Sequence, residues 1–122
     1  MAKIQRLPGN QRTRHWGSAY KDLVWVVGIS DDFSLPFKEQ ASRAYANVDR
    51  LLAEAGTDRT QILTVNVILT DLNEKAVFDE MWADWVGDDP QCWPQRSLHR
   101  ADLAPGVLLE ILTLAVRETS NS

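Results

Sequence analysis

Short runs of apolar and β-branched residues predict the strands of this chain. Leu23–Val27 is such a run and ends at Gly28, and Gln61–Thr70 is a second one with six apolar residues. Ala2–Leu7 predicts a short edge strand, because a proline–glycine–asparagine turn follows it directly. Ser18–Asp22 is interpreted as a hairpin connection that leads into the strand at Leu23.

Two longer segments have the hydrophobic period of a helix instead. From Phe37 to Ala55, apolar and small residues recur at steps of three and four, which predicts an amphipathic helix that ends at Gly56. A second helix is predicted from about Glu74 to Val86, capped by Asp71 or Asn73, with an aromatic apolar face.

The last part of the chain, Trp93–Val116, combines two predicted strands with two opposite charges. Arg96 stands at the start of the first strand, and Leu108–Val116 is almost wholly apolar, which predicts a strand buried on both faces. Glu110 interrupts this apolar run, and burying an unpaired carboxylate costs several kcal/mol or shifts its pKa. We therefore expect Arg96 and Glu110 to lie on neighbouring strands and to frame a small polar site.

The order of these elements predicts an α+β fold with one sheet and both helices on one of its faces. Two helices leave the other face of such a sheet uncovered, although several strands are apolar on both sides. We therefore expect a symmetric homo-oligomer in which the uncovered faces meet. The chain of 122 residues is expected to be a single domain, 1–122, with a core at about 14–117 and a frayed C-terminal tail.

Composition narrows the class of protein further. A net charge of -4 and the absence of a basic block argue against binding to nucleic acid or to an anionic membrane. The single cysteine, Cys92, and an N-terminus without a signal-peptide core favour a cytoplasmic protein. His15 and His99 have no metal-ligand spacing to each other or to Cys92, so a metal site is not expected.

An ordered set of motifs over roughly Arg14–Val116 resembles the RidA/YjgF family, in a divergent branch of it. The stretches that carry the resemblance are Gln40–Ala41, Ala46–Gly56, Ile62–Leu72, the aromatic positions Phe78, Trp82 and Trp85, Pro94–Ser97, and Leu108–Ile111. The resemblance implies a chorismate-mutase-like fold (bacillus type), a homotrimer, and ligand clefts where subunits meet. Its implied partners are a small carboxylate-containing metabolite and further copies of the chain. No membrane partner is expected, because no apolar run approaches the roughly 20 residues of a membrane span.

The resemblance also implies an activity: cofactor-free hydrolysis of enamines or imines, such as 2-aminoacrylate or other 2-imino acids, to a 2-keto acid and ammonia. Arg96 matches the family arginine that holds the substrate carboxylate, which suits a planar guanidinium. Glu110 matches the family glutamate that orients or activates the attacking water. Gly28 matches the family glycine at the end of the second strand, and the resemblance implies that the backbone of Gly28 and of the adjacent Ile29 contacts the ligand.

Several positions differ from the deaminating members of the family. Leu98 stands where cysteine is frequent, Val27 where serine is usual, and Asp79 where an asparagine is usual. Arg14 or His15 occupies the neighbourhood of a family tyrosine. Trp93 is a further candidate for lining the cleft. The predicted substrate-binding residues are Gly28, Ile29, Arg14, Trp93 and Leu98.

Other interpretations stay open from the residues alone. Arg96 is also compatible with a structural ion pair to Glu110 or Asp102. The alternative functions are a non-catalytic trimer that binds or senses a small carboxylate and, against the acidic charge of the chain, an endoribonuclease.

Overall fold

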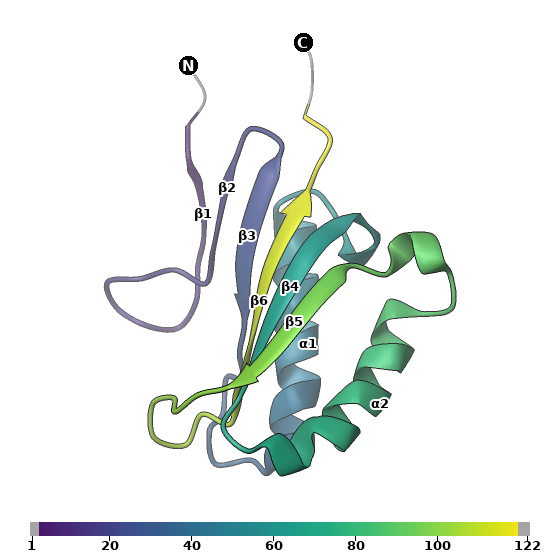
Figure 1. Cartoon of the computed structure of the whole chain (residues 1–122). Coiled ribbons are helices and arrows are strands. Elements are labelled where there is room, and N and C mark those ends of the chain that lie inside the picture. The colour runs from purple at the N-terminus through teal and green to yellow at the C-terminus, as the bar shows by residue number, and fades with distance from the viewer. Residues whose placement is uncertain (1–2, 120–122) are drawn as a thin grey trace.

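The computed structural model describes residues 3–119 and shows one mixed sheet with two helices packed against one of its faces (Figure 1). The strands are β1 (Gln5–Leu7), β2 (Gly17–Tyr20), β3 (Leu23–Gly28), β4 (Ile62–Leu69), β5 (Gln95–Arg100) and β6 (Leu109–Val116). The helices are α1 (Phe37–Glu54) and α2 (Lys75–Val86), with short 3₁₀ turns η1 (Arg59–Gln61), η2 (Leu72–Glu74) and η3 (Pro90–Cys92). The predicted α+β class and the placement of both helices on one face are confirmed.

The strands lie in the order β1-β2-β3-β6-β4-β5. Every pair is antiparallel except β4 with β5, which run parallel. A parallel pair needs a long crossover, and α2 supplies it between β4 and β5. The C-terminal strand β6 thus lies inside the sheet, between β3 and β4.

The predicted boundaries hold for most elements, with one clear error near the N-terminus. Ser18–Tyr20 was expected to be part of a connection, but it belongs to β2, which pairs with β3. The turn between β2 and β3 is only Lys21–Asp22, and Lys21 has a positive φ of 52°. Of the predicted edge strand, Gln5–Leu7 forms β1, while Ala2 lies outside the described residues.

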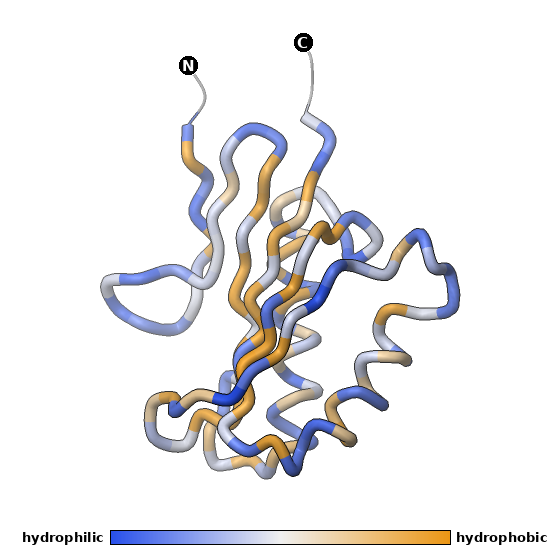
Figure 2. The backbone as a smooth tube through the Cα atoms, in the orientation of Figure 1, coloured by the Kyte–Doolittle hydropathy of each residue, from blue (hydrophilic) through white to orange (hydrophobic). Residues whose placement is uncertain are grey.

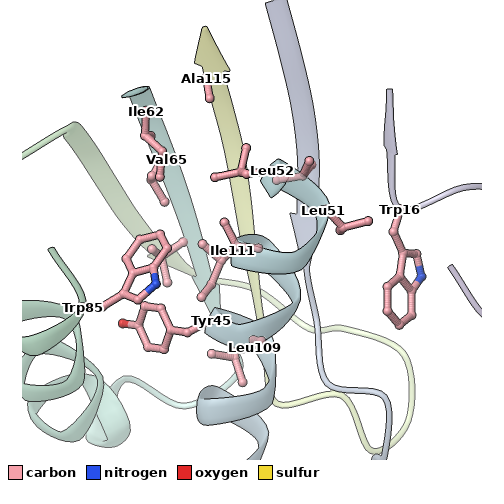
Figure 3. Packing of buried hydrophobic residues seen from close by; sticks show 14 of the residues in the cluster. Trp16, Tyr45, Leu51, Leu52, Ile62, Val65, Trp85, Leu109, Ile111 and Ala115 are labelled. Carbon is pink, nitrogen blue, oxygen red and sulfur yellow. The ribbon is translucent and has the colours of Figure 1, made fainter. Parts of the chain in front are cut away.

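The core lies between the sheet and the two helices. The Tyr45 ring of α1 packs against Trp85 of α2 at a centroid distance of 5.0 Å (Figure 3). It also packs against Phe78 of α2, at 5.4 Å. Burial raises the pKa of the Tyr45 hydroxyl strongly, so it stays protonated and donates to the Phe78 carbonyl at 3.3 Å. Trp85 is buried as expected of a core residue, whereas Trp82 is only half-buried.

The opposite face of the sheet carries no helix among residues 3–119 (Figure 1). Figure 2 shows hydrophobic positions along β3, β4 and β6, with hydrophilic positions in the loops and along β5. On this uncovered face, Trp25 is 45% exposed, and Leu112 and Leu114 of β6 are half-buried. The expectation that Leu108–Val116 is buried on both faces is therefore wrong for the single chain, in which alternate residues of β6 face outward.

Candidate functional site

Arg96 and Glu110 do not form a site within one chain, contrary to the expectation of neighbouring strands. Strand β4 separates β5 from β6 in the sheet. Arg96 aligns with the buried Val65 of β4, and Glu110 aligns with the half-buried Ile68. Because successive residues of a strand point to opposite faces, the two side chains lie on opposite sides of the sheet. Arg96 faces the helices, and Glu110 faces the uncovered side.

The Arg96 side chain is held against α2. Its Nη2 lies 2.8 Å from Oδ1 of Asp79, and the side chain is 19% exposed. The guanidinium carbon lies 5.6 Å from the ring centroid of Phe78 and 5.0 Å from that of Trp82. Rings and carboxylate together fix the orientation of the guanidinium through cation–π contact and an ion pair.

The carboxylate that pairs with Arg96 is therefore Asp79, and neither predicted structural partner is correct. Asp102 pairs with Arg100 instead, at 3.0 Å. Asp79 also binds Lys75, one helical turn earlier, with 2.5 Å between Nζ and Oδ2. Partial burial raises the pKa of Asp79, but the contacts with Lys75 and Arg96 outweigh this effect and leave the pKa below its usual value. Two cations and one anion thus form a charge cluster on α2 and β5.

Glu110 lies in a different environment, a pocket of about 260 Å³ at the uncovered side. The pocket is lined by residues of the β1–β2 loop, of β3 and its following loop, of the β5–β6 connection and of β6: Gln11, Arg14, His15, Trp16, Val27, Ile29, Phe33, Ala104, Val107 and Glu110. Burial raises the pKa of Glu110, because an ionised carboxylate loses hydration there. Within residues 3–119 no ion pair or side-chain hydrogen bond involves this carboxylate.

A buried glutamine holds two walls of this pocket in place. Nε2 of Gln40 donates to the carbonyls of Leu35 and Gly106, both at 2.9 Å, and its Oε1 accepts from the Leu108 amide at 3.1 Å. Gln40 is only 1% exposed, so these bonds satisfy a polar group inside the core. They tie the loop after β3 to the β5–β6 connection, and thereby hold Phe33 and Val107 beside Glu110.

Gly28 and Ile29, both expected near the ligand, have different surroundings. A Cβ on Gly28 would lie 2.4 Å from Cγ2 of Val48 and 2.9 Å from the Ala44 carbonyl, so the glycine allows α1 to approach the sheet closely. Its open side therefore faces the helix. Ile29 does line the Glu110 pocket, and its carbonyl accepts from Nδ2 of Asn47 at 2.6 Å.

Arg14 reaches the same pocket from the loop between β1 and β2. The loop is fastened by Trp16, which is buried and packs so closely on Gly9 that a Cβ there would lie 2.3 Å from the indole. Nε of Arg14 donates to Oε1 of Gln11 at 2.9 Å, and no ion pair of Arg14 occurs within residues 3–119. The pocket thus has a cation available on its rim.

Trp93 and Leu98 belong to the Arg96 side of the molecule. Trp93 is 53% exposed, donates its indole N–H to the Gly87 carbonyl at 2.8 Å, and lines a cavity of about 320 Å³ together with Trp82. Leu98 is half-buried and packs against the core.

The predicted site residues therefore divide into two groups: Arg96, Leu98 and Trp93 near α2, and Glu110, Arg14 and Ile29 around the pocket. Sequence reasoning missed Lys75, for which the spacing of Lys75 and Asp79 on a predicted helix was an available signal.

Neither a metal cluster nor a membrane-spanning helix is found in the described part of the chain. Residues 3–119 contain no group of three or more histidine, cysteine, aspartate or glutamate side chains that could hold a metal ion. None of the helices there is both long and apolar enough to cross a bilayer.

Comparison with known proteins places these features in a family. The family model described as Endoribonuclease L-PSP matches residues 27–117. A RutC family protein of Haemophilus influenzae is 33% identical over 101 residues, which cover 80% of this chain and 85% of that protein. TdcF of Escherichia coli K12, named as a candidate reactive intermediate deaminase, is 32% identical over 122 residues, 94% of this chain and 95% of that protein.

Solved structures show the same architecture. An uncharacterized protein of Pseudomonas aeruginosa has a TM-score of 0.83 at 27% identity, over 95% of this chain and 100% of that one. A YjgF family member of Neisseria meningitidis also has a TM-score of 0.83, at 24% identity, over 97% of this chain and 98% of that one. With the family model covering most of the chain, the protein belongs to the RidA/YjgF family, as the order of its sequence motifs indicated.

Proposed function

We propose that this protein hydrolyses reactive enamine or imine intermediates, converting 2-imino acids to 2-keto acids and ammonia. The observation that carries the proposal is the carboxylate of Glu110, which has no ionic partner within residues 3–119 and is desolvated in a pocket of about 260 Å³. A carboxylate with a raised pKa is a better base near neutral pH than an exposed one. The E. coli relative whose name describes a reactive intermediate deaminase supports the same reaction class.

The site is completed, in this proposal, where two copies of the chain meet in a homotrimer. Arg96 and Glu110 lie on opposite faces of one sheet, so one chain cannot direct both at one small molecule. The uncovered face around Trp25, Leu112 and Leu114 is apolar and half-exposed, as is typical of a surface that a further copy covers. Arg96 of one copy then acts together with Glu110 of its neighbour.

The chemistry needs only these two groups and water. Arg96 binds the substrate carboxylate and holds C2 of the imine in place. Glu110 takes a proton from a water molecule as its oxygen adds to C2 of the protonated imine, which forms a carbinolamine. Glu110 then returns its proton to the nitrogen, and as the C–N bond breaks the carboxylate accepts the hydroxyl proton, so that ammonia and the 2-keto acid leave.

The direct test generates a 2-imino acid with an amino-acid oxidase and follows its consumption in the presence of the purified protein. Wild type should accelerate the loss of the imine, while Arg96→Ala and Glu110→Gln should each slow it by about 100-fold or more. Arg100→Ala is the matched control, since Arg100 is exposed on the same strand and pairs with Asp102. Wild-type rates in both site variants would refute the proposal.

The ion pair between Arg96 and Asp79 favours a second candidate, a trimer that binds or senses a small carboxylate without turning it over. A guanidinium that is already paired provides less attraction for a ligand anion. This candidate predicts thermal stabilisation by 2-keto acids that depends on Arg96, without acceleration of imine loss. The endoribonuclease named in the family description is the least favoured, because the net charge of -4 suits a polyanionic substrate poorly.

A further inference from the structure

The Arg96 guanidinium already holds a carboxylate that belongs to the protein itself. Asp79 contacts the guanidinium at 2.8 Å, and the rings of Phe78 and Trp82 pack against it. A ligand carboxylate that binds the remaining N–H groups of Arg96 must therefore lie near the negative charge of Asp79. At an exposed fraction of 19% for the arginine side chain, water screens this repulsion only in part.

We propose that Asp79 is a specificity-determining residue of the Arg96 site, and that it selects zwitterionic imino acids over anionic keto acids. The inference rests on the proposed function, in which Arg96 binds the ligand carboxylate. A protonated 2-imino acid carries one positive and one negative charge, so its net interaction with Asp79 is small. The 2-keto acid product carries only the negative charge, and Asp79 repels it.

Lys75 limits this repulsion, because its ammonium group lies 2.5 Å from the other oxygen of Asp79. The three groups together carry a net charge of +1, which still attracts an anion weakly. Removing Asp79 should raise the net charge to +2 and strengthen the binding of a plain carboxylate. Removing Lys75 should lower it to zero and weaken that binding. Opposite effects from two touching residues are a sign of electrostatic tuning, since loss of packing at either residue has no reason to strengthen binding.

The test measures the affinities of pyruvate and of L-alanine, a stable zwitterion, by NMR titration of the assembled protein. Asp79→Asn keeps the shape of the side chain and should bind pyruvate about five- to tenfold more tightly, with L-alanine changed less than twofold. Lys75→Gln should bind pyruvate several-fold more weakly than wild type. Glu80→Gln is the matched control, because it removes the same charge from the next residue of α2, which lines a different cavity.

The outcomes separate this inference from the proposed function. If Arg96→Ala binds pyruvate as wild type does, Arg96 is not the anchor and the proposed function fails. If Arg96→Ala loses pyruvate but Asp79→Asn binds it no more tightly than wild type, or at no detectable level, the selection by Asp79 is refuted. Equal tightening of pyruvate and L-alanine, or the same gain in Glu80→Gln, also refutes it.

Discussion

The two faces of the sheet differ in how their charged groups are paired. On the helix-covered face, Arg96 is packed between aromatic rings and paired with Asp79, which itself pairs with Lys75. On the uncovered face, Glu110 is desolvated and without an ion pair within residues 3–119. One face satisfies its charges internally, and the other leaves a charge unpartnered beside apolar surface. This difference supports the proposal that a further copy of the chain covers the uncovered face.

The largest effect is expected when Arg96 and Glu110 are changed, and it tests whether Arg96 of one copy and Glu110 of another form one site. Arg96→Ala and Glu110→Gln should each lose turnover when expressed alone. Co-expressed, they should regain about a quarter of wild-type activity, because a random mixture places an intact Arg96 opposite an intact Glu110 at one contact in four. The rate of imine loss in the purified mixture is the measurement. Activity that stays at the level of the separate variants would contradict a site shared between two copies.

The next largest effect concerns assembly through the uncovered face. Leu114, which aligns with Trp25 and Thr64 at the middle of this face, becomes charged in Leu114→Glu. We expect light scattering to give one third of the wild-type mass, with an unchanged helical circular-dichroism signal. Leu72→Glu is the control, since Leu72 is 50% exposed in η2, away from this face. An unchanged mass for Leu114→Glu would place the contact between copies elsewhere.

On the helix-covered face, Gly28→Ala should reduce the free energy of unfolding by about 1–3 kcal/mol, because the new methyl group overpacks the contact with α1. The new Cβ would lie 2.4 Å from Cγ2 of Val48. Urea denaturation measures the effect. The double variant Gly28→Ala/Val48→Ala should cost less than the sum of the two single variants. Strict additivity would show that the methyl group and Val48 do not compete for the same space.

The smallest effect is expected in how the stability of the fold depends on pH through the ionisation of Glu110. Its pKa is raised in the folded chain, so ionisation destabilises the fold as the pH rises through the ordinary glutamate value of 4.5 towards the raised folded value. Glu110→Gln removes this penalty, and above that window it should be slightly more stable than wild type. Below pH 4.5 the two proteins should unfold alike. Thermal unfolding across pH tests this, and a stability loss in the variant at neutral pH would contradict it.

Much of the fold was predictable because it depends on local patterns. The three- and four-residue steps from Phe37 to Ala55 match α1, and the β-branched run at Leu23–Val27 matches β3. The error at Ser18–Tyr20 has a physical cause: this short strand is stabilised by pairing with β1 and β3 more than by its own composition. The motif order also identified the family correctly.

The sequence by itself determined which segments form strands and helices, and that Arg96 and Glu110 need partners, because periodicity and burial costs are properties of short segments. Only the tertiary structure decided that Asp79 is the partner of Arg96 and that Glu110 has no ionic partner within residues 3–119. Strand β4 lies between β5 and β6, and its long-range pairing with both strands, which no local pattern specifies, turns Arg96 towards Asp79 of α2 and Glu110 to the other face. A shift of one residue along a strand reverses the face of a side chain, so proximity in sequence could not show that the two charges are separated by the sheet.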